Sequence, residues 1–358
     1  MSDLRTAGLD RRRFLAVGGL VGAGAVLASC TSNDPDTAGN NNNEGQAAAV
    51  GNNDNAAAGK EVTIGFSAPQ ADHGWIAAIS KNAENQAKKF SDVTFEPVEA
   101  TNEVTRQISS VETLIAKKVS ALVILPFDGK ALTAVAQKAT AAGIPVVNLD
   151  REFDTPQAYR TLIKGDNYGM GVSAATYIGD QLKAKNVSNP VIVEIAGIDN
   201  LQLTQDRSRG FKETLAKYGY KVTARQAAQF TVESGQQVAA NLLQAQPNIN
   251  AMWNHDDDQG VGVLQAMQQA GRKEFIMVGG AGSLDAMEHI KKGDTPLEAT
   301  VTYSPTMASS AISLARLVAQ GRKMSELAEL QVPKLIILQS ETITKANVDQ
   351  YLPLGLRS

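Results

Sequence analysis

The sequence predicts an α/β fold made of two doubly wound parallel-sheet lobes joined by a three-strand hinge. Short apolar runs alternate with stretches of helical periodicity from residue 60 onward in this 358-residue chain. The apolar runs are continuous rather than alternating, which is typical of parallel strands covered by helices on both faces. These strand–helix units are too many for one small sheet, so we expect two similar lobes.

Four apolar runs in the first half of the chain predict four strands. They include Val62–Phe66, Ala121–Leu125 and the stretch Gly143–Leu149, which gives a turn and then a strand, while the more mixed segment Val93–Val98 also reads as a strand. Apolar residues at helical spacing lie between these runs, over residues 75–90 and 104–115 and from Gly129 onward. Asp128 precedes the third of these helices and is a residue type that caps helix N-termini.

The same rhythm returns in the second half. Strands are predicted at Val191–Ala196, Val222–Ala227, Ala251–Asn254 and Phe275–Val278. Helices are predicted near residues 168–184, 203–218, 233–245 and 258–270. A last helix near residues 305–320 and a strand at Leu335–Leu338 complete the pattern.

The repeated pattern suggests where each lobe begins and ends. We expect residues 60–164 plus 304–331 to form the N-terminal lobe and residues 165–303 plus 332–358 to form the C-terminal lobe. The hinge crossings are then expected near Lys164–Asp166, Tyr303–Pro305 and Gln331–Pro333. Ligands of doubly wound sheets bind beyond the carboxyl ends of the strands, so facing lobes predict a cleft lined by those ends.

The first 29 residues predict a signal peptide. Asp10–Leu15 reads as a twin-arginine export signal, and Leu27–Cys30 reads as a lipoprotein cleavage box. The apolar stretch between them is shorter than the roughly 20 residues that span a bilayer. Cys30 is therefore the expected lipidation site. A buried core helix or an uncut membrane helix is the alternative interpretation of this stretch.

Residues 30–59 predict a lipidated flexible tether. Asn, Ala, Gly and Asp dominate the segment after Cys30, and Val50 is its single large aliphatic residue. Such a composition buries too little apolar surface to offset the entropy of ordering. We expect the protein to be exported and held by its lipid at the outer face of the cytoplasmic membrane.

Composition excludes several classes of function. The formal net charge of −3 comes without a basic stripe, so no nucleic-acid partner is expected. A single cysteine excludes intrachain disulfides and cysteine-rich metal sites. We expect a monomer with no cofactor and no metal.

Polar side chains cluster where the predicted strands end. Gln70–Trp75 follows the first strand, and Asp150–Arg151 follows the fourth. Asp206–Phe211 precedes a helix of the second lobe, and Asn254–Asp258 follows another strand. These loops are far apart in the sequence, yet the fold predicts that they share one ligand-binding rim.

This arrangement resembles the type I periplasmic sugar-binding proteins of ABC importers, the ribose-binding group in particular. The resemblance extends from Val62 to about Leu338 and depends on several features in a fixed order. They are a polar loop and an aromatic after the first strand, Leu149–Arg151, Arg207 before Gly210–Phe211, Phe230, Asn241–Leu243 followed by Pro247, and His255–Asp257.

The resemblance implies a ligand site at matching positions. The implied ligand-binding residues are His73, Trp75, Asp150, Arg151, Arg207, Phe230, Asp256 and Tyr303. Asp256 stands where ribose-binding members have Asn. Two further positions depart from the family pattern: Ala281 replaces an Asp, and Tyr303 replaces a Gln before the hinge proline. These departures argue against ribose itself.

The chemistry of these residues suits a small neutral polyhydroxylated ligand. A hydroxyl group both donates and accepts hydrogen bonds, so Asp and Arg side chains can bind adjacent hydroxyls together. The aromatic faces of Trp75 and Phe230 would cover the carbon–hydrogen faces of the ligand. The resemblance also implies an ABC permease as the partner, while pentoses, hexoses and linear alditols stay open.

Structural roles are the alternatives for these residues. Trp75 and Phe230 could be ordinary core, His73 an incidental loop residue, and Arg207 half of a surface ion pair. Asp150 and Arg151 could simply cap a strand end. The run Asp256–Asp258 could suggest a metal, but Asp257 or Asp258 can instead cap the following helix.

Other classes of function are disfavoured by the motifs. The chain has no His-Glu-x-x-His, Gly-x-Ser-x-Gly or phosphate-loop motif, so an enzyme is not expected. An exported hydrolase is the alternative from a different class, and a sensor of an autoinducer or nucleoside is the alternative within binding proteins. A repressor of the lactose-repressor type shares the core but carries an N-terminal helix-turn-helix, where this chain has an export signal.

Overall fold

The computed structural model describes residues 55–324, 327, 329 and 331–355, which contain two six-stranded sheets. The first sheet has the order β11-β5-β4-β3-β1-β2, and all of its pairings are parallel. Its strands are β1 (Val62–Ser67), β2 (Val93–Pro97), β3 (Ala121–Ile124), β4 (Val146–Leu149), β5 (Thr161–Gly165) and β11 (Leu335–Leu338). The twin-arginine motif, Cys30 and most of the predicted tether lie outside the described residues.

The second sheet repeats the arrangement with the order β12-β10-β9-β8-β6-β7. Its strands are β6 (Ile192–Ala196), β7 (Val222–Ala227), β8 (Ala251–Asn254), β9 (Ile276–Ala281), β10 (Leu297–Thr302) and β12 (Thr342–Thr344). Only the pairing of β12 with β10 is antiparallel. The expected fold class, two parallel-sheet lobes of alternating strands and helices, is confirmed.

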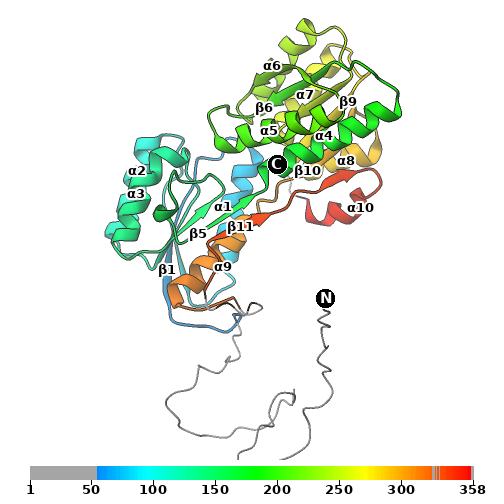
Figure 1. The fold of residues 1–358 in the computed structure, drawn as a ribbon. Coiled ribbons are helices and arrows are strands. Elements are labelled where there is room, and N and C mark those ends of the chain that lie inside the picture. The colour runs from blue at the N-terminus through cyan, green and yellow to red at the C-terminus, as the bar shows by residue number, and fades with distance from the viewer. Residues whose placement is uncertain (1–54, 325–326, 328, 330, 356–358) are drawn as a thin grey trace, which may run out of the picture. The chain divides into compact units, whose positions relative to one another are not determined.

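Helices cover both faces of each sheet (Figure 1). In the first lobe, α1 and α9 pack on one face, and α2 and α3 pack on the other. In the second lobe, α4 and α5 pack on one face, and α6 and α7 on the other. The helices are α1 (Gly74–Ala87), α2 (Val104–Ala116), α3 (Gly129–Ala141), α4 (Asn167–Ala184), α5 (Gln202–Lys217), α6 (Val232–Ala245), α7 (Asp257–Gln269), α8 (Leu284–Lys292), α9 (Met307–Gln320) and α10 (Val348–Tyr351).

The chain passes between the sheets at three places, and one differs from the expectation. The passages from β5 to α4 and from β10 to α9 lie where the sequence predicts them. The third lies between β11 and β12, after Leu338, and not at Gln331–Pro333. Residues 332–358 therefore do not all belong to the C-terminal lobe, because β11 pairs with β5 in the first sheet.

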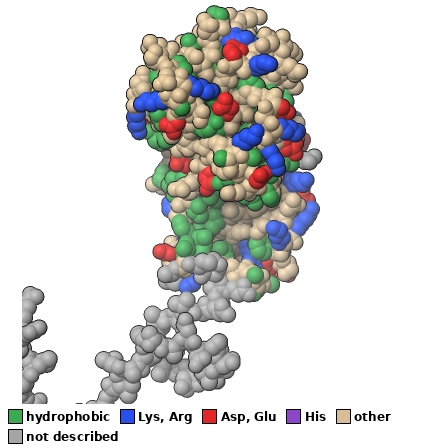
Figure 2. Space-filling view, turned by 90° about the vertical axis from the view of Figure 1, so that its right-hand side faces the viewer, with side chains coloured by type: hydrophobic (Ala, Val, Ile, Leu, Met, Phe, Trp, Pro, Cys, Tyr) green, Lys and Arg blue, Asp and Glu red, His purple; other side chains and the backbone are tan. Residues whose placement is uncertain are grey.

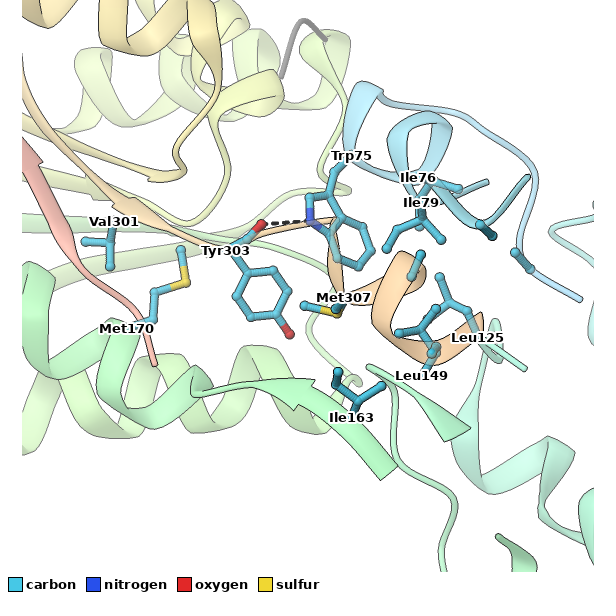
Figure 3. Close-up of a cluster of buried hydrophobic side chains, with 14 of the residues drawn as sticks. Trp75, Ile76, Ile79, Leu125, Leu149, Ile163, Met170, Val301, Tyr303 and Met307 are labelled. Carbon is cyan, nitrogen blue, oxygen red and sulfur yellow. Dashed lines mark hydrogen bonds between the residues drawn. The ribbon is translucent and has the colours of Figure 1, made fainter. Parts of the chain in front are cut away.

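One hydrophobic cluster continues from lobe to lobe through these passages. It includes Trp75 and Ile79 of α1, Met170 of α4 and Met307 of α9, with Tyr303 between them (Figure 3). Burial of apolar side chains is the main favourable contribution to folding. The hinge is thus packed as core rather than formed by loose linkers.

The described part of the chain shows neither a basic surface on the face in Figure 2 nor a helix suited to a membrane. Acidic and basic side chains are interspersed over the face shown in Figure 2, without a continuous basic area there. Among the described residues, no helix combines the length and the apolar character that crossing a bilayer requires.

Candidate ligand-binding site

One pocket brings together all eight residues that the sequence singled out. It encloses about 340 Å³ of empty space, part of which is open to solvent. Its lining consists of His73, Trp75, Asp150, Arg151, Leu203, Arg207, Phe230, His255, Asp256, Ala281 and Tyr303. The sequence did not single out Leu203 and His255 as ligand contacts.

The fold explains why residues so distant in sequence meet here. His73 is the residue before α1, Arg207 lies in α5, and Asp256 is the residue before α7. Asp150 follows β4 directly, and Tyr303 follows β10 directly. Each position is at the carboxyl end of a parallel strand or in the helix that follows it, where doubly wound sheets bind ligands.

Two carboxylates each use one oxygen within the protein. Asp150 Oδ1 accepts a hydrogen bond from the Tyr303 hydroxyl. Asp256 Oδ1 accepts from the backbone N–H groups of Asp258 and Gln259, at 2.9 and 3.1 Å, and thereby caps α7. No described residue donates to Oδ2 of Asp150 or of Asp256. Burial raises the pKa of Asp150, and it raises the pKa of Asp256 to about 6.

Two guanidinium groups are held in the same manner. Arg207 donates from Nε to Asn167 Oδ1 at 2.9 Å and from Nη1 to the His255 carbonyl at 3.0 Å. Arg151 donates from Nη1 to the Phe127 carbonyl at 2.8 Å. Its buried Nε has no acceptor among the described residues. The Nη2 groups of both arginines likewise have no acceptor among the described residues.

Tyr303 and Trp75 form the aromatic floor. The Trp75 indole N–H donates to the Tyr303 carbonyl at 2.9 Å, and the two rings are 5.6 Å apart (Figure 3). The Arg207 guanidinium lies 4.5 Å from the centre of the Tyr303 ring, a cation–π contact. Gly165 permits this packing, because a Cβ there would lie 2.1 Å from the Tyr303 ring. Burial raises the pKa of Tyr303, so its hydroxyl stays neutral.

His73 belongs to the rim of the pocket. Its Nδ1 lies 2.5 Å from Asp72 Oδ1, and its ring centre lies 6.0 Å from that of Phe230. Burial opposes protonation of His73, but the Asp72 hydrogen bond and the charges of Asp256 and Asp258 prevail and raise its pKa. The raised pKa favours the protonated imidazole of His73 relative to a free histidine, next to the acidic side of the pocket.

Backbone strain concentrates at this pocket. Among the described non-glycine residues, five have a positive φ: Lys118, Asp150, Asn186, Phe230 and Ala281. Three of them line the pocket, with φ values of 63° for Asp150, 65° for Phe230 and 102° for Ala281. Left-handed conformations cost free energy outside glycine and are found preferentially at functional sites. No periodicity or motif in the sequence signals these conformations.

The acidic run at the start of α7 does not converge on one point. Asp256 caps α7, whereas Asp257 accepts from the backbone N–H groups of Gly280 and Ser283 at 2.9 and 2.8 Å. Asp258 accepts from the Trp75 backbone N–H at 3.1 Å. The capping residue is thus Asp256, and the expectation of Asp257 or Asp258 in that role is wrong, because Asp256 holds the extended backbone that precedes the helix. Within the described ranges, no group of three or more His, Cys, Asp and Glu residues is placed to hold a metal.

The fold and this pocket define a type I periplasmic binding protein. A profile of the periplasmic binding protein domain matches residues 64–323, and the chain belongs to that family. The family expected from the sequence is therefore confirmed.

Individual relatives share most of their length with this chain. The ribose import binding protein RbsB of Bacillus subtilis (strain 168) is 34% identical over 253 residues, which cover 71% of this chain and 80% of the relative. The galactofuranose-binding protein YtfQ of Escherichia coli (strain K12) is 30% identical over 261 residues, covering 70% and 80%. A solved structure from Mycobacterium smegmatis in complex with β-D-fucofuranose has 28% identity and a TM-score of 0.74 and covers 82% of this chain and 94% of that one.

Proposed function

We propose that this chain is the solute-binding lipoprotein of an ABC importer and captures a neutral monosaccharide or sugar alcohol in the pocket between its lobes. The observation that carries the proposal is a set of carboxylate oxygens and guanidinium N–H groups in the pocket that have no partner among the described residues. Asp150 and Asp256 each offer one carboxylate oxygen, and Arg151 and Arg207 each offer N–H groups. Hydroxyl groups complement both kinds of group at once.

The charges of the pocket favour a neutral ligand. Asp150 and Asp256 oppose two guanidinium groups across one small space, and His73 is paired with Asp72, so no excess of either sign is left for an ionic ligand. Charge-assisted hydrogen bonds are roughly twice as strong as neutral ones, so a neutral ligand can still bind tightly. The ring of Trp75 presents an apolar face, because its N–H is already bonded to the protein.

The relatives support a sugar of this kind. The names of the two curated relatives include ribose and galactofuranose, and the M. smegmatis structure holds β-D-fucofuranose. Ala281 and Tyr303 still argue against ribose itself, because a carboxylate and an amide of the family pattern are both missing. Sugars with five-membered rings and linear alditols of similar size are the ligands we favour.

Export and anchoring complete the proposal. The family is one of exported proteins, in agreement with the twin-arginine motif and the lipobox ending at Cys30. A diacylated cysteine provides two acyl chains, which hold stably where one chain is marginal. The protein would then work as a monomer at the outer face of the cytoplasmic membrane and pass its ligand unchanged to a permease.

A thermal-shift screen of residues 31–358 tests the ligand class. We would compare D-ribose, L-arabinose, D-galactose, xylitol and myo-inositol, with glucose 6-phosphate as the charged control. A ligand at 100 times its Kd stabilises the folded state by about 2.7 kcal/mol, so a true ligand raises the Tm by several degrees. Stabilisation by glucose 6-phosphate alone would contradict a neutral ligand. Chemical conversion of a screened sugar during incubation would instead indicate an exported hydrolase.

A further inference from the structure

A buried carboxylate without a role in the proposed ligand contacts lies behind Arg207. Glu194 is in β6, and its side chain has no exposed surface. Its Oε1 accepts hydrogen bonds from Ser208 Oγ and from His255 Nε2, the second at 3.0 Å. A buried charge is costly unless it is paired, so this position invites a specific explanation.

Two partners of Glu194, Ser208 and His255, are linked to Arg207. Ser208 is the next residue along α5, and the backbone carbonyl of His255 is the acceptor for Arg207 Nη1. Glu194 therefore joins the helix that carries Arg207 to the strand end that holds its guanidinium group. Arg207 and His255 line the pocket, whereas Glu194 lies behind them.

We propose that Glu194 is a positioning residue, which fixes the orientation of the Arg207 guanidinium in the pocket through Ser208 and His255. The proposal rests on the proposed function only in assigning Arg207 to the ligand. The hydrogen bonds join protein groups only, so their effect can be measured on the protein alone.

The protonation states suit a rigid support. Burial lowers the pKa of His255 to about 4, so the imidazole is neutral and Nε2 donates its hydrogen to Glu194. Burial also works against ionisation of Glu194, but the hydrogen bonds from His255 and Ser208, together with Arg225, prevail and lower its pKa. Arg225 Nε lies 3.5 Å from Glu194 Oε1. Because the Glu194 carboxylate accepts from the neutral imidazole, the ring hydrogen of His255 stays on Nε2, and the ring keeps one orientation.

The same residue types also occur in nucleophilic enzymes, but the geometry here differs. In such enzymes the histidine lies between the nucleophile and the acid and accepts the hydroxyl proton. Here Ser208 and His255 both bond to the same oxygen of Glu194, and all three residues are buried. The arrangement joins two structural elements, and His255 is bonded to Glu194 and not to the Ser208 hydroxyl.

Nuclear magnetic resonance of the ligand-free exported chain tests the proposal. The Nε–H signal of Arg207 is assigned by its loss in Arg207→Lys, and its hydrogen exchange is measured. Glu194→Leu should accelerate this exchange by about tenfold or more. In Glu194→Gln the exchange should stay as slow as in the native chain, because the glutamine amide oxygen still accepts from Ser208. The control is Glu298→Gln, which removes a charge from β10 in the same lobe, where Glu298 is bonded to Tyr177.

Ser208→Ala keeps the test decisive if Glu194→Leu fails to fold. This smaller change removes one of the two links and should also accelerate exchange of the Arg207 Nε–H. Unchanged exchange in a folded Glu194→Leu or Ser208→Ala protein would overturn the proposal. Equal acceleration in Glu298→Gln would do so as well, because it would reveal a general effect of lost charge.

A double-mutant cycle, measured on ligand binding, separates this proposal from the proposed function. The ligand is the sugar that gives the largest shift in the screen. Introduced alone, Glu194→Leu should weaken its binding about tenfold. Introduced into the Arg207→Lys variant, the same change should weaken binding hardly at all. Equal losses in both backgrounds would overturn the positioning role. If none of the screened polyols binds, the proposed function fails, while the exchange measurement still decides the role of Glu194.

Discussion

Arg207, a proposed ligand contact, is held in place by three groups of the protein. Asn167 and the His255 carbonyl fix two of its nitrogen atoms, and the Tyr303 ring lies against its face. The side chain is almost fully buried. An arginine held in this way loses little conformational freedom on binding, which favours affinity.

Replacing Arg207 should therefore weaken ligand binding strongly. For Arg207→Ala we expect a loss of about 1.5–3 kcal/mol, because a charge-assisted hydrogen bond to a ligand hydroxyl disappears. Isothermal titration calorimetry with the screened sugar measures it. Arg209→Ala is the matched control, since Arg209 is on the same helix, pairs with Asp206 and is exposed. Unchanged affinity in Arg207→Ala would remove this residue from the site.

His73 should make stability depend on pH. Its pKa is raised in the folded state, so the folded protein binds the proton more tightly than the unfolded chain does. The resulting stabilisation is fully present below pH 6.5 and is lost as the pH rises through the raised pKa. We expect His73→Gln to flatten the change in Tm between pH 6 and pH 8. His289→Gln is the control, and an identical profile for His73→Gln and the native chain would contradict the assignment.

At the scale of elements, the start of α1 depends on the opposite lobe. The residue before α1 makes no side-chain cap, and the Trp75 N–H in its first turn is instead satisfied by Asp258 of α7. Free N–H groups at a helix start need an acceptor, and a side-chain cap contributes about 1 kcal/mol. This contact stabilises α1 only while the lobes are together.

Removing this contact should shift the lobes toward opening. We expect Asp258→Ala to weaken ligand binding about fivefold, equivalent to the loss of one cap. Asp128→Ala is the control, because Asp128 caps α3 within the first lobe through the Ala131 N–H at 2.8 Å. That variant should lower the Tm and leave affinity unchanged. Equal affinity of Asp258→Ala and the native chain would argue against the contact across the lobes.

Strand prediction was most direct where runs of large apolar residues were continuous, although β7 was also predicted at its exact bounds, Val222–Ala227, despite a mixed composition. β1, β3, β4, β6 and β8 lie close to their predicted bounds, because their buried side chains are all or mostly apolar. β5, β10 and β12 were not predicted, since Thr, Lys, Glu and Gly interrupt them. The edge position of β11 depends on its pairing with β5, which no local pattern encodes.

The pocket was predictable to a similar degree. The rule of strand ends and the family resemblance together named eight residues that the structure brings into one pocket. The supporting contacts of Asn167, Glu194 and Asp258 were not predictable, because each joins elements that are distant in the sequence. A hydrogen-bond partner is chosen by three-dimensional proximity, which spacing along a chain does not report.

At the scale of the whole molecule, we expect the anchor and the binding unit to be separable. The described residues all belong to one compact unit, and Cys30 precedes that unit in the sequence. Cys30→Ala should therefore release the exported protein from membranes without changing its affinity for the ligand. Cell fractionation and calorimetry measure the two properties. Persistent membrane attachment of Cys30→Ala would mean that the leader is not cleaved.

Tyr303 has two places in the structure at once, at a passage between the lobes and in the pocket. It stands directly after β10, where the chain passes from one lobe to the other, and it also lines the pocket through its contacts with Asp150 and Trp75. A substitution of Tyr303 would change both the lining of the pocket and the packing of the passage between the lobes. Engineering of the ligand preference is therefore better directed at His73 and Phe230, which line the pocket but lie outside the passages between the sheets.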